Sequence, residues 1–271
     1  MQVIKGKVAV VTGAGSGIGR ALAIALAAQG CNLALADINP ESLKETQRLL
    51  DSNFFESNVH VTLHTVDVSQ WEPMEAFADN VFEQHRQVNM LINNAGVTMG
   101  ALFKDVSLDD MRRIMDINFW GVVYGCKAFV SRIKTADEAT IVNISSVFGL
   151  ISAPMNSAYC ASKFAVRGFS DALRHEVGYM GKNFKVACAF PAGVKTSIAD
   201  NAKLTLHAKS GSSGQQQRAH MEQLFLTTAE DAAIDILRGI QKGKTRIRVG
   251  KGSILIDLLS RLLPVKYMAF L

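Results

Sequence analysis

Tyr159 and Lys163 lie four residues apart and form a pair that could move a proton. Both fall in residues 157–178, whose pattern predicts a helix, so their side chains share one face. Free tyrosine has a pKa of about 10 and is a poor base at neutral pH, but a nearby lysine cation favours the phenolate. Tyr159 could then take a proton from an alcohol or give one to a carbonyl. Because such pairs are common on helices, only the surrounding residues can show whether this pair is catalytic.

Two serines, Ser145 and Ser146, end an apolar run that predicts a strand at 140–145, and Ser146 lies 13 residues before Tyr159. A hydroxyl at this place could hold a substrate oxygen beside the phenol. A serine at the end of a strand is more often only part of a turn. The residues by themselves leave both serines as candidates.

A glycine-rich turn joins the first predicted strand to the first predicted helix, with the pattern G-x-x-x-G-x-G on Gly13, Gly17 and Gly19. Glycines let the backbone approach a pyrophosphate, and the helix N-terminus adds unpaired N–H groups. No Gly-Lys-Ser/Thr follows, which excludes a Walker loop. Ile18 and Arg20 stand where the third glycine of G-x-G-x-x-G would fall, which excludes that fingerprint. A glycine-rich turn alone is weak evidence for a nucleotide.

Asp37 ends the second predicted strand, 18 residues after Gly19. A carboxylate there can accept hydrogen bonds from an adenosine ribose and would repel a 2′-phosphate. Neither Gly15 nor Ile38 offers a cation to offset that repulsion, so we expect NAD rather than NADP as the cofactor. The simpler interpretation is an aspartate that caps a turn.

Two further polar segments follow strands: Asp67-Val68 after the third, and residues 93–96 (Asn-Asn-Ala-Gly) at the end of the fourth. Ligands of open α/β sheets bind at the carboxyl ends of the strands. Either segment could be only a turn former.

Short β-branched runs alternate with longer helical stretches along the chain. Strands are predicted at 7–12, 32–37, 59–66, 90–93, 140–145 and 185–190, and helices at 18–29, 41–51, 73–85, 107–132 and 157–178. This alternation predicts an α/β fold, a doubly wound parallel sheet (Rossmann fold) in three α/β/α layers. With no Pro/Gly linker before residue 200, we expect residues 1–271 to form one domain, with a linker or substrate lid at about 197–225.

Together these residues resemble the short-chain dehydrogenase/reductase family, in its short single-domain branch. The matching residues are Thr12-Gly13, Gly17-Ile18-Gly19, Asn93-Asn94-Ala95-Gly96, Asn118, Ser146 and Tyr159-Cys160-Ala161-Ser162-Lys163, over about residues 5–200. The resemblance implies an NAD(P)-dependent oxidoreductase acting on CH–OH groups, in which hydride passes between substrate and nicotinamide. The positively charged nicotinamide ring should also favour the phenolate form of Tyr159.

The resemblance also implies roles for individual residues. The family's spacing selects Ser146 over Ser145, and Asn118 would fix a water that links the lysine to bulk solvent. The catalytic set is then Asn118, Ser146, Tyr159 and Lys163. The expected cofactor-binding residues are Gly13, Ser16, Gly17, Ile18, Gly19, Asp37, Asp67, Val68, Asn94, Ala95, Gly96, Tyr159, Lys163, Pro191, Val194 and Thr196.

One segment departs from the family pattern. The family usually has Pro-Gly-x-Val-x-Thr after the sixth strand, whereas this chain has Pro191-Ala192-Gly193-Val194-Lys195-Thr196. The glycine is displaced by one position, so Ala192 could alter the turn beside the nicotinamide. Val194 and Thr196 still fall where they could bond the carboxamide.

The expected substrate-lining residues, by resemblance in placement, are Met99, Ser146, Phe148 and Met155. They are mostly apolar and include no arginine to hold a carboxylate, so we expect a hydrophobic secondary alcohol or ketone. Two alternatives stay open: an NADPH-dependent reductase of 3-oxoacyl thioesters, against which Asp37 counts, and a non-catalytic NAD-sensing protein on the same fold. The family further implies a homodimer or homotetramer formed through helices near 107–132 and 157–178.

Charge is unevenly distributed along the chain, whose net charge is +5. Residues 242–271 hold seven basic residues and one acidic residue, so the first 241 residues are close to neutral and do not predict nucleic-acid binding. Residues 253–271 carry an apolar helical stripe of Ile254, Leu255, Leu258, Leu259, Leu262 and Leu263, ended by Pro264. The stripe predicts packing on the protein or a partner subunit, or peripheral contact with an anionic membrane.

Four cysteines without C-x-x-C spacing, and the lack of a signal-peptide pattern or a long apolar run, lead us to expect a cytoplasmic protein, with membrane association through the tail as an alternative. The six histidines show no metal-ligand spacing, and we expect no metal.

Overall fold

The computed structural model describes residues 1, 3–54, 59–133, 136–180, 183–194, 203–204 and 227–267. Its main feature is a seven-stranded parallel sheet with the strand order β3-β2-β1-β4-β6-β7-β9. The strands are β1 (Val8–Thr12), β2 (Asn32–Asp37), β3 (Val61–Thr65), β4 (Met90–Asn93), β6 (Ala139–Ile144), β7 (Phe184–Pro191) and β9 (Arg246–Val249). The strand order reverses between β1 and β4, which creates a crevice at the carboxyl ends of these strands.

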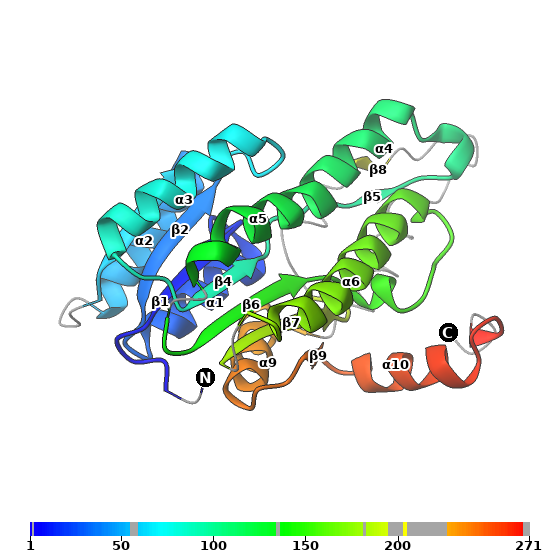
Figure 1. Cartoon of the computed structure of the whole chain (residues 1–271). Helices are drawn as coiled ribbons and strands as arrows, with labels where there is room; N and C mark the ends of the chain where they lie inside the picture. The colour runs from blue at the N-terminus through cyan, green and yellow to red at the C-terminus, as the bar shows by residue number, and fades with distance from the viewer. Residues whose placement is uncertain are drawn as a thin grey trace.

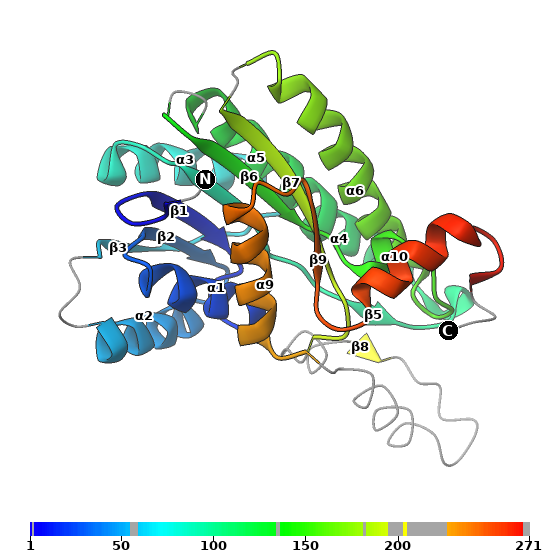
Figure 2. The same cartoon turned by 90° about the horizontal axis from the view of Figure 1, so that it is seen from below.

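Helices cover both faces of this sheet (Figures 1 and 2). One face carries α1 (Gly17–Ala27), α2 (Pro40–Phe54) and α9 (Ala229–Gln241), and the other carries α3 (Trp71–His85), α4 (Leu108–Met115), α5 (Gly121–Ile133) and α6 (Ser157–Val177). Each face has its own apolar core. Every residue of β1, β4 and β6 is buried, as expected for strands covered on both sides. The predicted doubly wound, three-layer fold is therefore confirmed.

The stretch predicted as one helix at 107–132 is interrupted. A π-helical turn, η2 (Asp116–Trp120), separates α4 from α5, and the amide of Gly121 donates to the carbonyl of Asp116, five residues back. Such turns insert one residue into a helix and are frequent at functional sites. This one contains Asn118, which is fully buried.

Among the elements that the sequence analysis missed are α9 and β9. β9 extends the sheet by a seventh strand. Its buried residues Ile247 and Val249 alternate with the more exposed Arg246 and Arg248. The start of α9 carries a recognisable cap, since the hydroxyl of Thr228 accepts from the amide of Asp231. Two short strands, β5 (Met99–Gly100) and β8 (Lys203–Leu204), form a separate parallel pair.

After β9 the chain forms α10 (Ser253–Leu262), within the predicted C-terminal helix. This helix turns Asp257 inward, at 2% exposure, and leaves most of the predicted apolar stripe in solvent. Of the three possibilities left open for the stripe, packing on its own domain is therefore disfavoured, and a partner subunit or a membrane surface remains. Among the described residues, no helix is long and apolar enough to cross a membrane.

Candidate active site

Tyr159 and Lys163 project from the first turns of α6, as their spacing predicted. The Nζ atom of Lys163 lies 5.6 Å from the centre of the Tyr159 ring. It donates a 3.0 Å hydrogen bond to the carbonyl of Ile144, the last residue of β6. Lys163 is 4% exposed, so α6 holds its ammonium group inside the protein, against the end of the sheet.

Ser146 lies two residues beyond the end of β6 and directly precedes a 3₁₀ turn, η3 (Val147–Gly149). Its hydroxyl oxygen accepts from the amide of Phe148 at 3.2 Å. The Ser146 side chain also lies close enough to the Tyr159 phenol to lower its pKa. Ser145 instead donates to the carbonyl of Lys163 at 2.8 Å and so braces α6. Of the two candidate serines, only Ser146 has its hydroxyl at the phenol.

Burial disfavours the charged forms of both Tyr159 and Lys163 and shifts their pKa values accordingly. Burial raises the pKa of Tyr159 to about 12, against the hydrogen bond from Ser146, which lowers it. Burial lowers the pKa of Lys163 to about 8. The sequence predicted a lowered pKa for Tyr159, whereas in the chain without ligand desolvation is the largest influence and raises it. At neutral pH the phenol is protonated and the lysine is mostly charged.

Asn118 fixes the loop after β4 against α6. Its side chain accepts from the amide of Val97 at 2.8 Å and donates to the Val97 carbonyl at 2.9 Å and to the hydroxyl of Ser162 at 3.0 Å. A Cβ atom on Gly96 would lie 3.1 Å from Asn118 Oδ1 and 3.5 Å from Lys163 Nζ. These contacts bring Gly96, Asn118 and Lys163 together, and the role of Asn118 in holding a water stays a prediction.

The glycines of the turn allow close backbone packing that side chains would prevent. Gly13 has a φ of +66°, and a Cβ there would lie 2.8 Å from the Cα of Ala95. A Cβ on Gly19 would overlap the carbonyl oxygen of Gly13. The turn leads into α1, whose first turn holds no acidic residue. A helix N-terminus that follows a glycine-rich turn fits a pyrophosphate group.

Asn94 and Ala95 reinforce this turn from the neighbouring strand. Both amides donate to the hydroxyl of Thr12, at 3.0 and 3.1 Å. The Asn94 side chain donates to the carbonyls of Thr12 and Gly13 at 3.0 and 3.2 Å. Thr12 was only part of the motif in the sequence analysis, yet its hydroxyl joins the ends of β1 and β4.

Asp37 lies beside the same turn, at the end of β2. Its two carboxylate oxygens accept from the amides of Gly15 at 2.8 Å and Asn39 at 3.0 Å. The guanidinium of Arg20 donates to the Gly15 carbonyl and, at 3.0 Å, to the Thr46 hydroxyl. The premise that no cation lies near Gly15 is therefore wrong, because one turn of α1 brings Arg20 back to it.

The third strand end is occupied by Asp67 and Val68. Asp67 accepts from the amide and the hydroxyl of Ser69, at 3.0 and 2.7 Å. Val68 is buried against Gly121, at the start of α5. Both residues follow the carboxyl end of β3, as the sequence predicted.

The displaced glycine after β7 has a structural reason. Ala192 continues the strand pairing, with its amide donating to Val249 at 3.0 Å, whereas Gly193 takes a left-handed φ of +49°. Pro191 ends β7 in a buried position, and Val194 forms a bridge to Thr227. Thr196 and the expected lid, apart from residues 203–204, lie outside the described residues.

The expected substrate-lining residues do not all lie beside the phenol. The ring of Phe148 meets Tyr159 edge-on, with centroids 6.1 Å apart. Met155 has a left-handed φ of +63°, and its carbonyl accepts from Ala101 at 2.8 Å. Met99 is 5% exposed and packs with Ile114 and Ala158 in a small apolar cluster. Phe148 therefore borders the phenol, while Met99 belongs to the packing behind it.

The described residues contain no group of three or more His, Cys, Asp or Glu side chains that could hold a metal. All four cysteines are buried and free. Burial raises the pKa of Cys126 and of Cys188 to about 12, which makes reactive thiolates unfavourable at both positions.

Comparison with known proteins agrees with this geometry. Residues 7–206 match the short chain dehydrogenase family. "Putative oxidoreductase SadH" of Mycobacterium tuberculosis is 40% identical over 98% of this chain and 94% of its own length. A short chain dehydrogenase/reductase from Burkholderia phymatum, solved in complex with NAD, superposes with a TM-score of 0.86 at 31% identity, covering 99% of this chain and 97% of the other. Carveol dehydrogenase from Mycobacterium avium in complex with NAD gives 0.81 at 25% identity, covering 94% and 100%. The chain therefore belongs to the short-chain dehydrogenase/reductase family and is an oxidoreductase of CH–OH groups.

Proposed function

We propose that this enzyme interconverts hydrophobic secondary alcohols and ketones with NAD(H), using Tyr159 as the general acid and base. The observation that carries the proposal is the convergence of the Ser146 hydroxyl and the Lys163 ammonium group on Tyr159, from two different elements. A nucleotide-sensing protein would have no need of this arrangement.

The side chains of the site suit proton transfer to and from a substrate oxygen. In the reductive direction, the Tyr159 phenol, protonated with a pKa of about 12, donates its proton to the developing alkoxide while Ser146 holds the same oxygen. The Lys163 cation stabilises the phenolate that remains. In the oxidative direction the phenolate accepts the alcohol proton. A bound nicotinamide supplies or accepts the hydride.

The residues around the glycine-rich turn support NAD as the preferred cofactor. Asp37 lies beside Gly15, where a ribose hydroxyl would approach, and its carboxylate opposes a 2′-phosphate. Arg20 lies close enough to weaken that preference, but its donors are directed at backbone carbonyls and at Thr46. We therefore expect NAD to be favoured over NADP.

The proposed substrate class rests on the apolar surroundings of the phenol and on one relative. The ring of Phe148 meets Tyr159 edge-on, and Met155, four residues before Tyr159 in the chain, is also apolar. The similarity to carveol dehydrogenase supports the same class, since carveol is a hydrophobic secondary alcohol.

The test measures the change in absorbance of the nicotinamide with NAD or NADP and a series of secondary alcohols of increasing chain length. NAD-dependent turnover that rises with chain length, and that Tyr159→Phe abolishes, supports the proposal. Equal efficiency on short polar and long apolar alcohols contradicts the substrate class. Turnover of 3-oxoacyl thioesters with NADPH alone identifies the thioester reductase, and NAD binding without turnover identifies a sensor.

We also propose a homodimer or homotetramer formed through the long helices. Trp120, at the end of η2, and Phe164, on α6, are 43% and 38% exposed, and a second copy would cover such side chains. Sedimentation velocity measures the mass in solution. A monomer at all concentrations tested contradicts this assembly.

A further inference from the structure

Helix α10 presents its apolar side to solvent. Four residues of the helix are exposed, and one more follows it; we call this set the docking face: Ile254 (65%), Leu255 (57%), Leu258 (51%), Leu262 (68%) and Val265 (87%). The side that faces the protein is polar, with Ser253 and Asp257 at 1% and 2% exposure. A surface helix normally buries its apolar stripe. A contiguous apolar face of this kind indicates a binding partner.

The inverted orientation is fixed by an ionic cluster. Asp257 Oδ1 lies 2.7 Å from Arg246 and 3.1 Å from Arg261, and Asp257 Oδ2 lies 3.6 Å from Arg248. Arg246 and Arg248 come from β9, so the cluster ties α10 to the edge of the sheet. Burial raises the pKa of Asp257, but hydrogen bonds and charge from Arg246 and Arg261 outweigh it and hold the pKa below its usual value. The polar side of α10 thus has a specific place in the fold.

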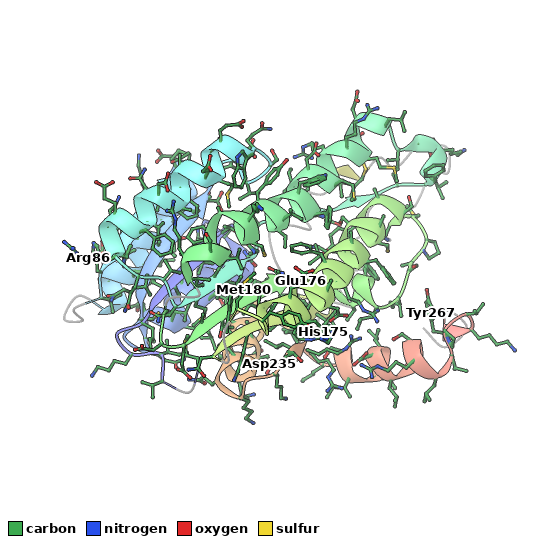
Figure 3. All side chains as sticks on the ribbon, viewed as in Figure 1. Arg86, His175, Glu176, Met180, Asp235 and Tyr267 are labelled. Carbon is green, nitrogen blue, oxygen red and sulfur yellow. The ribbon has the colours of Figure 1, made fainter. Side chains whose placement is uncertain are left out.

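A second anchor lies beyond the helix. The hydroxyl of Tyr267 accepts from the amide of Ser152 at 2.8 Å and donates to its carbonyl at 3.4 Å, across 115 residues. Figure 3 shows Tyr267 beyond the end of α10. Ser152 lies between η3, which directly follows Ser146, and α6, which carries Tyr159. In both ribbon views α10 lies outside the two helix layers, next to this loop (Figures 1 and 2). With both ends anchored, the leucines are held outward.

The segment that carries the docking face is rich in cations. Asp257 is the one acidic residue among residues 242–271, against seven basic ones, and it points inward. Lys251 and Lys266, on either side of the helix, are exposed, and Arg261 is 59% exposed at the rim of the apolar side. In a symmetric contact between two copies, these cations would face the same cations of the partner. An anionic surface with an apolar interior complements both properties.

We propose that α10 lies in the interface of an anionic lipid bilayer, with the docking face among the acyl chains and Lys251, Arg261 and Lys266 at the headgroups. Amphipathic helices with cationic rims bind membranes in this way, and each cation near an anionic leaflet strengthens binding. The helix has 10 residues, half of the roughly 20 that a spanning helix needs. It therefore lies along the surface. The proposal is independent of the substrate, because it uses no residue of the catalytic set.

The test is co-sedimentation of the full chain with vesicles of phosphatidylcholine, with and without phosphatidylglycerol. We expect binding to the anionic vesicles, weaker binding to the neutral ones, and weakening by salt. The double variant Leu258→Glu/Leu262→Glu should lower the partition coefficient at least about tenfold, because it places carboxylates among acyl chains. The matched control is Ile234→Glu on α9, a position with 47% exposure, which should bind as the native chain does.

A second pair of variants separates charge from apolar contact. Lys251→Glu/Lys266→Glu should weaken binding to anionic vesicles by roughly fivefold or more per reversed charge, and leave binding to neutral vesicles nearly unchanged. The control Lys127→Glu, an exposed lysine on α5, should have little effect. Thermal unfolding and NAD binding confirm that each variant is folded, since none of these residues contacts the catalytic set.

Three outcomes overturn the proposal. The first is that the native chain binds neither kind of vesicle. The second is that the leucine variant binds as well as the native chain, so that any attraction is charge alone. The third is that the leucine variant dissociates an oligomer seen by sedimentation velocity while vesicle binding is absent, which assigns the docking face to a second copy.

Discussion

The hydroxyl of Thr12 accepts hydrogen bonds from the backbone amides of both Asn94 and Ala95, and so joins the carboxyl ends of β1 and β4. These two strands flank the point at which the strand order reverses. The spacing between them sets the width of the crevice in which a dinucleotide would lie. A side chain with no expected contact to the substrate thereby determines the shape of the cofactor site.

Thr12→Val should damage this site without changing the volume of the side chain. Thr12 is 2% exposed, so the variant leaves two amides without their acceptor, and we expect a loss of about 1–3 kcal/mol in the free energy of unfolding. NAD affinity should fall as well. Urea unfolding and calorimetric titration with NAD measure both effects. Thr12→Ser keeps the hydroxyl and should retain most of the stability, and equal losses in both variants would contradict the assignment.

Gly19→Ala should abolish NAD binding, because the new methyl group would overlap the Gly13 carbonyl and force the turn open. The chain offers a matched control in Gly168, on α6, where an added Cβ meets nothing within 4 Å. Gly168→Ala should leave NAD binding intact and stabilise the helix by about 0.5–1 kcal/mol. Fluorescence titration with NADH distinguishes the two variants. Unchanged affinity in Gly19→Ala would show that the turn does not hold the phosphates.

Asp37→Asn tests the cofactor preference. It keeps an oxygen that can accept from Gly15 and removes the negative charge. The ratio of kcat/KM with NADP to kcat/KM with NAD should rise at least about tenfold, because one repulsive charge is lost. Glu41→Gln, an exposed carboxylate at the start of α2, serves as the control for long-range charge. A ratio that stays constant would shift attention to Arg20.

His85 should make the protein less stable in acid. Burial, followed by the nearby His60 and His64, lowers the pKa of His85 to about 4 from a usual value of about 6.5. Below pH 6.5, His85 is protonated in the unfolded chain but stays neutral in the folded chain until the pH approaches 4. Stability present above pH 6.5 is therefore lost as the pH falls towards 4, by up to about 3 kcal/mol.

Denaturant unfolding at a series of pH values measures this loss, and His85→Gln should flatten the curve. The hydroxyl of Thr62, which lies 2.9 Å from the His85 ring, can bond to the new amide. His175→Gln, an exposed histidine on α6 (Figure 3), should leave the curve unchanged. An unaltered acid transition in His85→Gln would assign the loss to other groups.

Regular periodicity explains why much of the fold and the core of the site could be predicted from the sequence. Six apolar runs and the helices between them define the sheet. A spacing of four residues on a helix was enough to bring Tyr159 and Lys163 together. The glycines of the first turn were equally readable, because close backbone approach requires them.

The features that were missed depend on distance through space. Arg20 was read as a helix residue, and nothing local shows that its guanidinium returns to Gly15. The pKa of Tyr159 depends on burial, which the pair spacing does not contain. For α10, the apolar stripe could be predicted but its direction was left open, because the arginines of β9 determine which side faces the protein. β9 has only four residues, and because its two buried residues alternate with arginines, it lacks the continuous apolar run by which the other strands were predicted.

The π-helical turn at Asp116–Trp120 adds one residue between α4 and α5 and so sets how the two helices are rotated relative to each other. An α-helix advances about 100° per residue, so the extra residue rotates everything after it relative to everything before it. Deleting Ile117 would restore a continuous α-helix and turn the two halves by that angle. Either Asn118 would lose Val97 and Ser162, or the buried side of α5 would lose β4. Insertions and deletions should therefore be tolerated far less in this segment than in an ordinary surface helix, although the sequence there looks like one.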